Sequence, residues 1–185
     1  MPKTPSTKSR PSEPWLSLFN DLDLRLTEKV QLHCCGGFVV TEVYGVVRPT
    51  SDMDFLQVVP HSFWSSIESL VGEGSALSKK YKVHLHSVTV ATYPESYADR
   101  LIEIFPGAWN HIQLFALEAH DLALTKLERN FERDLEDVEQ VALDEYLQPE
   151  VLRARYFEEF RPNLTSREVE CDRKLQEWCD LFWPG

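Results

Sequence analysis

Long hydrophobic runs are absent from this 185-residue sequence. No stretch approaches the roughly 18 consecutive apolar residues that a membrane-spanning helix requires, so we expect no membrane partner. The N-terminus, MPKTPSTKSRPSEP, also lacks the apolar segment of a secretory signal. It is rich in proline, serine and lysine, which predicts a disordered arm over residues 1–13.

Cysteine is scarce, and its spacing matches neither a disulfide framework nor a zinc-binding CxxC pair. Two of the four cysteines are adjacent and the other two lie eight residues apart: Cys34, Cys35, Cys171 and Cys179. Free thiols of this kind are typical of a reducing compartment, so we expect a cytoplasmic location.

An excess of basic residues is also missing. The net charge is −11, and residues 118–185 contribute most of it, with 18 acidic against 9 basic side chains. Broad DNA or RNA binding through an overall positive field is therefore not expected. A small anionic substrate bound through a metal ion would need no such field.

The apolar content of 43% is enough for a sizeable core, and the periodicity predicts an α+β protein. We expect a core over residues 14–117 and a helical region over 118–185 that packs on it. The expected strands are 30–35, 53–60, 81–91 and 111–117. The expected helices are 14–30, 38–45, 61–72, 96–105 (helix or bent segment), 119–147, 149–160 and 165–182, the last opening with a Thr165/Glu168 capping box.

A glycine pair, Gly36-Gly37, separates a predicted strand from a predicted helix. Glycines there allow close approach of the backbone to a ligand, and the N–H groups that begin a helix favour phosphate. A tight turn without a ligand is the other interpretation.

Two aspartates, Asp52 and Asp54, open an apolar segment 15 residues after the glycine pair. On a strand, residues i and i+2 face the same side and lie about 6.5–7 Å apart. Two carboxylates at this spacing can bind divalent ions and leave room for phosphate oxygens, which suits Mg²⁺ (or Mn²⁺). The alternative is a solvated turn in which Asp52 is a cap.

Together, the stretch CGGFVVTEVYGVVRPTSDMDF and the later DLALTKLERNFERDLEDV resemble the nucleotidyltransferase superfamily, which has the polymerase-β-like fold. Within it they are similar to the AbiEii/MenT-type toxin nucleotidyltransferases and their uncharacterised bacterial relatives. The resemblance covers about residues 30–145. It implies a nucleotidyltransferase-like mixed β-sheet with flanking helices, followed by a helical C-terminal half.

The resemblance also implies an activity: transfer of a nucleoside monophosphate from an NTP to a hydroxyl group. The implied acceptor is a tRNA 3′ end or a protein, in a toxin–antitoxin or phage-defence setting. Metal would be held by Asp52 and Asp54, and the nucleotide by Gly36, Gly37, Arg48, Thr50 and Ser51. Arg48 could equally be a counter-ion for the aspartates. The alternatives are an MNT-type antitoxin that adenylylates a partner toxin, and a non-catalytic nucleotide-binding or interaction module.

The second motif has an interpretation of its own. In one continuous helix, Lys126, Asn130, Arg133 and Asp137 would share a face, with Asp134 beside it. The resemblance implies that Lys126 contacts phosphates, while Asp134 or Asp137 orients it or acts as base. An exposed helix with surface ion pairs would give the same pattern.

One departure from the superfamily concerns a third carboxylate, which usually stands on a later strand. The matching segment here has no acid but carries His84 and His86. These could be metal ligands or a base, or one of them is a packed core or rim histidine. Asp134 or Asp137 could otherwise supply the missing carboxylate.

Overall fold

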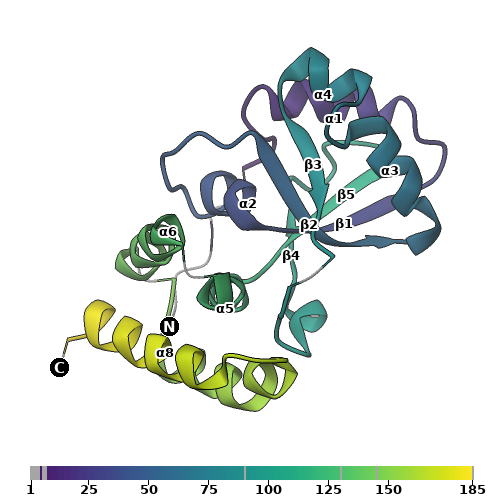
Figure 1. The fold of residues 1–185 in the computed structure, drawn as a ribbon. Helices are drawn as coiled ribbons and strands as arrows, with labels where there is room; N and C mark the ends of the chain where they lie inside the picture. Colours follow the sequence, from purple (N-terminus) through teal and green to yellow (C-terminus); the bar gives the residue numbers. More distant parts are fainter. Residues whose placement is uncertain (1–4, 6–7, 90, 130, 145, 185) are drawn as a thin grey trace. The chain divides into compact units, whose positions relative to one another are not determined.

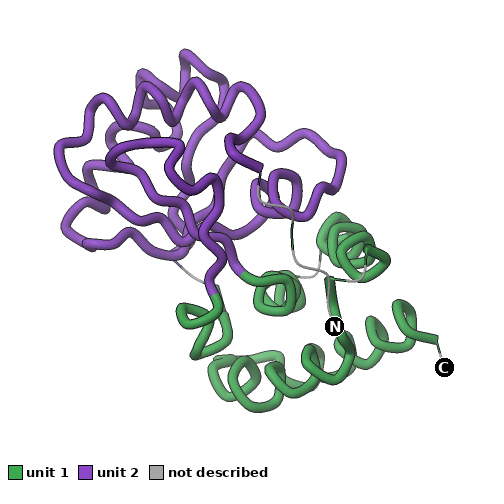
Figure 2. The backbone as a smooth tube through the Cα atoms, turned by 180° about the vertical axis from the view of Figure 1, so that it is seen from behind, with its two compact units in different colours: residues 1–5, 90–100, 118–185 green, residues 6–89, 101–117 purple. Residues whose placement is uncertain are grey.

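The computed structural model of the chain describes residues 5, 8–89, 91–129, 131–144 and 146–184 (Figure 1). It divides into two compact units (Figure 2). The sheet unit comprises residues 6–89 and 101–117, and the helical unit comprises 1–5, 90–100 and 118–185. Of the predicted arm, residues 1–4 and 6–7 lie outside the described part of the chain.

A five-stranded mixed sheet organises the sheet unit, in the order β3-β2-β1-β5-β4. Strand β1 pairs antiparallel with β2 and parallel with β5, β2 pairs parallel with β3, and β4 pairs antiparallel with β5. The strands are β1 Val30–Cys35, β2 Asp52–Val59, β3 His84–Ser87, β4 Ile102–Ile104 and β5 Ile112–Ala116. This mixed sheet, with flanking helices and a helical C-terminal half, confirms the predicted fold class.

The helices of the sheet unit are α1 Trp15–Asp23, α2 Gly36–Glu42, α3 Trp64–Val71 and α4 Ala76–Tyr81, with a 3₁₀ turn, η1, at His61–Phe63. Apolar periodicity explains α1, whose buried face includes Trp15 and Phe19. Phe38 of α2 packs against both rings, with centroids 5.0 Å from Trp15 and 6.3 Å from Phe19. This aromatic cluster ties the first two helices together.

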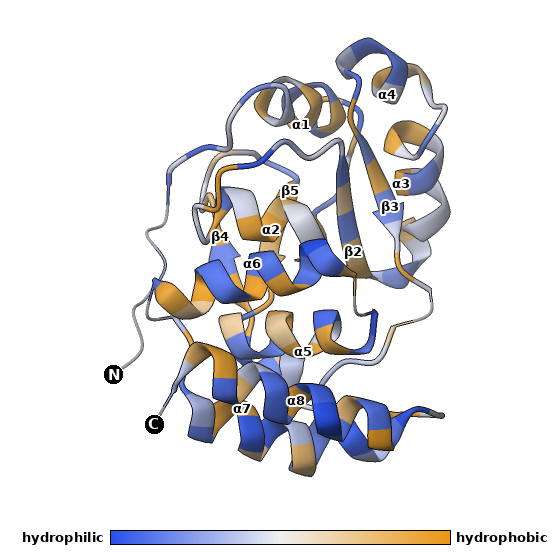
Figure 3. Ribbon diagram, turned by 60° about the vertical axis from the view of Figure 1, so that its left-hand side comes forward, coloured by the Kyte–Doolittle hydropathy of each residue, from blue (hydrophilic) through white to orange (hydrophobic). Residues whose placement is uncertain are grey.

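The helical unit contains α5 Ala119–Arg129, α6 Glu132–Leu143, α7 Pro149–Arg155 and α8 Glu168–Phe182. Shorter segments are the 3₁₀ turns η2 Tyr97–Arg100 and η4 Arg161–Asn163 and the π-helical η3 Tyr156–Phe160. Apolar and polar residues alternate along α6 and α8 (Figure 3), as expected for helices with one buried face. None of the described helices combines the length and the apolar character that a membrane span would need.

Several predicted boundaries were wrong within the sheet unit. The first helix ends at Asp23 rather than at residue 30, and the strand predicted over 81–91 is confined to His84–Ser87. Residues 76–81 form α4, which was not predicted: Ser75 caps its N-terminus by accepting from the Ser78 N–H, and Lys82 ends it with φ 58°. Such backbone choices are not visible in hydrophobic spacing.

The segment over 96–105, predicted as a helix or a bent segment, is a 3₁₀ turn followed by strand β4. Its isoleucines, Ile102 and Ile104, pair with Ala116 and Leu114 of β5. Three residues are too few for periodicity to separate strand from helix, so the neighbouring strand decides.

The prediction of one long helix over 119–147 was also wrong, because two helices, α5 and α6, occupy this region. Phe131 has an extended backbone (φ −82°, ψ 150°) and precedes the first residue of α6. The predicted Thr165/Glu168 capping box is likewise absent: α8 begins at Glu168, after Arg167 in the left-handed region (φ 71°), without a side-chain cap. Asn130 lies outside the described residues.

Asp23 links α1 to the segment that enters β5. Its buried carboxylate accepts backbone N–H bonds from Asn110 at 3.2 Å, His111 at 2.7 Å and Ile112 at 3.2 Å. Replacing Asp23 with alanine leaves these donors without their acceptor, so we expect a loss of about 3 kcal/mol in the free energy of unfolding. Urea denaturation measures it.

The matched control is Asp21→Ala, on the same helix, whose carboxylate contacts Lys80 and Tyr81 nearer the surface. Its expected cost is below about 1 kcal/mol. Equal losses for the two variants would contradict a special role for Asp23.

Asp121 is the centre of a buried ionic network in the helical unit. It is 0% exposed and accepts from Arg100 at 2.8 and 3.1 Å and from Arg155 at 2.9 Å. Arg100 also binds Glu159 at 2.8 and 3.0 Å. Removing one partner of a buried pair is costly, so we expect Asp121→Asn to destabilise the protein by about 3 kcal/mol in urea denaturation.

Glu177→Gln provides the comparison, because its ion pair with Arg173 is exposed on α8. This change should cost less than about 1 kcal/mol. The prediction fails if Asp121→Asn is no more harmful than Glu177→Gln.

Candidate functional site

The end of β1 leads directly into α2 through the glycine pair, and β2 begins beside it. Cys35, the last residue of β1, lies opposite Asp54 in the antiparallel register. Gly36 follows with φ +68°, a conformation that favours glycine. The glycine pair and the second aspartate are therefore neighbours in space, although 18 residues separate Gly36 from Asp54.

Gly36 makes a close approach to Asp54. A Cβ atom placed on Gly36 would lie 2.2 Å from Asp54 Oδ2 and 3.0 Å from Asp54 Cγ. No side chain larger than hydrogen fits there without moving the carboxylate. Asp54 itself is buried, so a shift has little free space to use.

Gly37 is crowded by the loop that leads into β2. A Cβ atom there would lie 2.7 Å from Arg48 Nη2 and 3.1 Å from Thr50 Oγ1. The Thr50 hydroxyl is also within hydrogen-bond distance of Asp52, 3.0 Å from its carbonyl and 3.2 Å from Oδ1. Asp52, which is exposed, is thus linked to Gly37 through Thr50.

Ser51 helps to align β2 with β3 through its backbone. Its carbonyl accepts from the His84 N–H at 3.0 Å, which extends the pairing of β2 with β3. The parallel register then places His84 opposite Asp52 and His86 opposite Asp54. Of these pairs, His86 and Asp54 are in contact, with Nδ1 3.0 Å from Oδ1.

The donor set fits a divalent ion that arrives with a phosphate ligand. Within the described residues, no group of three or more His, Cys, Asp or Glu side chains is arranged to hold a metal. Mg²⁺, however, is commonly held by one or two carboxylates together with water and substrate phosphates. Asp52 and Asp54 could supply that pair, and the close packing at Gly36 fixes one of them.

The helical unit holds the other predicted cluster. Lys126 Nζ lies 2.9 Å from Asp134 Oδ1 and 2.8 Å from Asp137 Oδ2, and all three side chains are buried. Arg129 adds a second cation at 2.7 Å from Asp134. Burial by itself would raise the pKa of Asp134, but the bonds and charges of Arg129 and Lys126 hold it below its ordinary value.

Lys126 reaches these carboxylates in a different way from the one expected. The shared helix face does not exist, because α5 ends at Arg129 and α6 begins at Glu132. Asp134 and Asp137 lie on α6 and reach Lys126 of α5 across the two helices. That Lys126 also faces Asp52 and Asp54 stays a prediction.

Two contacts of the site were not anticipated from the sequence. One is the hydrogen bond between His86 and Asp54, and the other is the ion pair between Arg129 and Asp134. The HxH spacing opposite the DxD spacing was the only available signal for the first. It becomes informative once the two strands are known to be adjacent and parallel.

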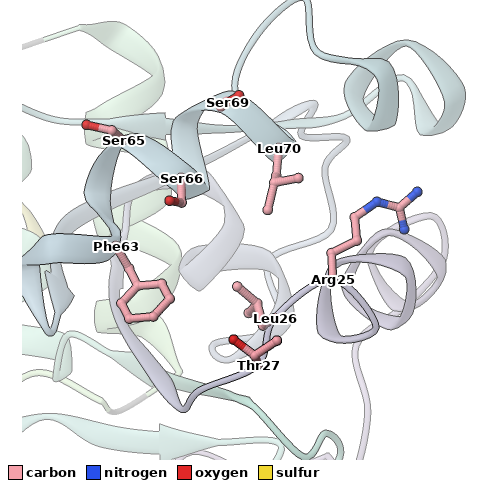
Figure 4. A pocket seen from close by; sticks show the side chains of 8 residues that line it. All are labelled: Arg25, Leu26, Thr27, Phe63, Ser65, Ser66, Ser69 and Leu70. Carbon is pink, nitrogen blue, oxygen red and sulfur yellow. The ribbon is translucent and has the colours of Figure 1, made fainter.

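A separate pocket of about 430 Å³ lies at the other end of β2 (Figure 4). It is lined by Arg25, Leu26, Thr27, Phe63, Ser65, Ser66, Ser69 and Leu70. These residues adjoin the end of the β1–β2 ladder where Gln31 pairs with Val59. Five residues of β2, or about 17 Å, separate that end from Asp54, so the pocket contains none of the predicted site residues.

Comparison with known protein families gives a match. A family model described as a nucleotidyltransferase of unknown function (DUF6036) matches residues 16–180. No curated protein and no solved structure matches the chain significantly. The matched region includes the glycine pair, the two aspartates and the Lys126 cluster, and it extends over most of the sequence, so the chain belongs to this nucleotidyltransferase family.

Proposed function

We propose that the protein is a Mg²⁺-dependent nucleotidyltransferase that moves a nucleoside monophosphate from an NTP to an acceptor hydroxyl and releases pyrophosphate. The observation that carries this proposal is the close approach of the Asp54 carboxylate to Gly36. It joins the two halves of the nucleotidyltransferase signature at one end of the sheet. Mn²⁺ would be an alternative to Mg²⁺.

In this proposal Asp52 and Asp54 hold the metal ion. When bound, Mg²⁺ would neutralise phosphate charge and orient the transferred group. Gly36 and Gly37 would cradle the triphosphate, because glycine allows the backbone to approach a ligand closely. Arg48 and Thr50, which crowd Gly37, and the neighbouring Ser51 would border the nucleotide.

The part assigned to Lys126 rests on the resemblance. Lys126 would contact phosphates, with Asp134 or Asp137 orienting it or acting as base. Replacing Lys126 is a poor test of that role, because the change would leave two buried carboxylates without this cation. The sheet unit therefore offers the cleaner experiments.

The acceptor is proposed from the same resemblance: a tRNA 3′ end or a hydroxyl on a protein, in a cytoplasmic toxin–antitoxin or phage-defence system. The acidic excess of residues 118–185 supports a limited, local contact with any nucleic acid rather than a broad one. An antitoxin of the MNT type, which would adenylylate its toxin partner, uses the same chemistry. The two roles differ only in the acceptor.

A nucleotide-binding module without turnover is the second candidate. It is favoured by the β3 residues opposite the aspartates, which are His84 and His86 rather than a carboxylate. Transfer depends on positioning and charge, so a missing carboxylate should slow the reaction more than it weakens nucleotide binding. Binding and turnover must therefore be measured side by side.

Asp54→Asn should weaken Mg²⁺-dependent NTP binding and abolish pyrophosphate release, because the amide cannot replace a metal-binding charge. We expect binding to weaken at least about tenfold in a calorimetric titration. Glu28→Gln, which removes an exposed carboxylate from the same unit, should leave both quantities unchanged. Unaltered binding by Asp54→Asn would refute the metal site, whereas wild-type binding without turnover on tRNA and protein acceptors would favour the module.

Gly36→Ala should disable the site sterically. Its Cβ atom would collide with Asp54 Oδ2, and the loss of NTP binding should approach that of Asp54→Asn. Gly45→Ala is the matched control, because Gly45 also has a positive φ (+78°) but nothing within 4 Å of a Cβ atom. Both variants bear a backbone strain of about 1–2 kcal/mol, so only their difference in NTP affinity reports the contact with Asp54.

A further inference from the structure

His86 and Asp54 form a pair across two neighbouring strands. The parallel register of β2 and β3 sets them side by side, and Nδ1 lies 3.0 Å from Oδ1. Their exposure differs sharply: 60% of the His86 side chain is accessible, against 11% for Asp54. The imidazole therefore stands at the surface while the carboxylate it contacts lies beneath.

The two oxygens of the Asp54 carboxylate have different neighbours. Oδ1 faces His86, and Oδ2 lies against Gly36. An ionised carboxylate only accepts hydrogen bonds, so Nδ1 must be the donor. These two contacts fix the rotation of the Asp54 carboxylate about its Cβ–Cγ bond.

Register alone does not account for this contact. His84 and Asp52 occupy the equivalent positions two residues earlier on the same strands. Within the described residues, however, no hydrogen bond or ion pair joins them. Asp52 is associated with Thr50 instead. The His86 contact is thus particular to Asp54.

Stabilisation of the fold is a weak explanation for the pair. Because the His86 ring is exposed, water can take its place as a donor to Asp54 when the ring is removed, so we expect the pair to contribute at most about 1 kcal/mol to the free energy of folding. A hydrogen bond to a metal-binding carboxylate, in contrast, commonly changes metal affinity by about 10–100-fold.

We propose that His86 is a positioning residue for metal binding: it donates Nδ1–H to Asp54 Oδ1 and so presents Oδ2 beside Gly36 to a divalent cation. The inference rests on the proposed function and adds a residue to it. On β3, where the superfamily usually has a third carboxylate, this chain would use an imidazole that acts through Asp54.

The test is binding of Mn²⁺ alone, measured by the loss of the free-ion electron paramagnetic resonance signal during titration into the millimolar range. His86→Ala should weaken Mn²⁺ binding by about 10–100-fold. His86→Asn should recover most of the affinity, because its amide N–H can occupy the place of Nδ1–H. The amide of His86→Gln lies one methylene group farther from the backbone, so this variant should recover less of the Mn²⁺ affinity.

His84→Ala is the matched control, since it shortens the equivalent histidine opposite Asp52 and should bind Mn²⁺ like the wild type. Thermal unfolding of every variant separates a loss of affinity from a loss of fold, and His86→Ala should melt near the wild-type temperature. Unchanged Mn²⁺ affinity in His86→Ala, or equal losses in the two alanine variants, would overturn the inference.

Asp54→Asn distinguishes this failure from that of the proposed function. If Asp54→Asn abolishes Mn²⁺ binding while His86→Ala leaves it unchanged, the metal site stands and only the role of His86 is refuted. If the wild type binds no Mn²⁺ and Asp54→Asn changes nothing, both the metal site and the role of His86 are refuted.

Discussion

The contact between Asp54 and Gly36 depends on how β1 and β2 are paired. Their register shifts by one residue between His33 and Cys34, so that His33 lies opposite Gln57 but Cys34 lies opposite Phe55. Without this irregularity, Phe55 rather than Asp54 would lie opposite Cys35, the residue that precedes the glycine pair. Since neighbouring residues of a strand point to opposite faces, a shift of one residue decides which side chain meets the glycine pair.

The residues of the sheet unit converge because of this arrangement. The Asp54 carboxylate packs against Gly36, and the loop that carries Arg48 packs against Gly37. The parallel pairing of β2 with β3 places His86 beside Asp54. The first two contacts need a residue without a side chain, which glycine supplies, and the third needs two strands in parallel register. The chemistry proposed here, metal-assisted transfer of a nucleotide, needs such positioning more than it needs many reactive groups.

The helical unit uses its charges differently. Its acidic excess is partly compensated inside the unit, where Asp121 binds two arginines and Lys126 binds two aspartates. Buried ions need partners, and removing one partner is more damaging than removing an exposed pair. The ion pairs of Lys126 with Asp134 and Asp137 therefore also connect α5 to α6.

The sequence by itself determined the α+β class, the position of β1 and the main strand β2, and the nucleotidyltransferase signature, because apolar runs and short motifs are local properties. It did not determine α4, β4 or the break near Phe131, which depend on caps, on a neighbouring strand and on single backbone angles. Only the tertiary structure decided that Asp54 meets Gly36 and His86. These contacts arise from strand register and pairing, and no local pattern encodes which residues of distant strands will lie opposite one another.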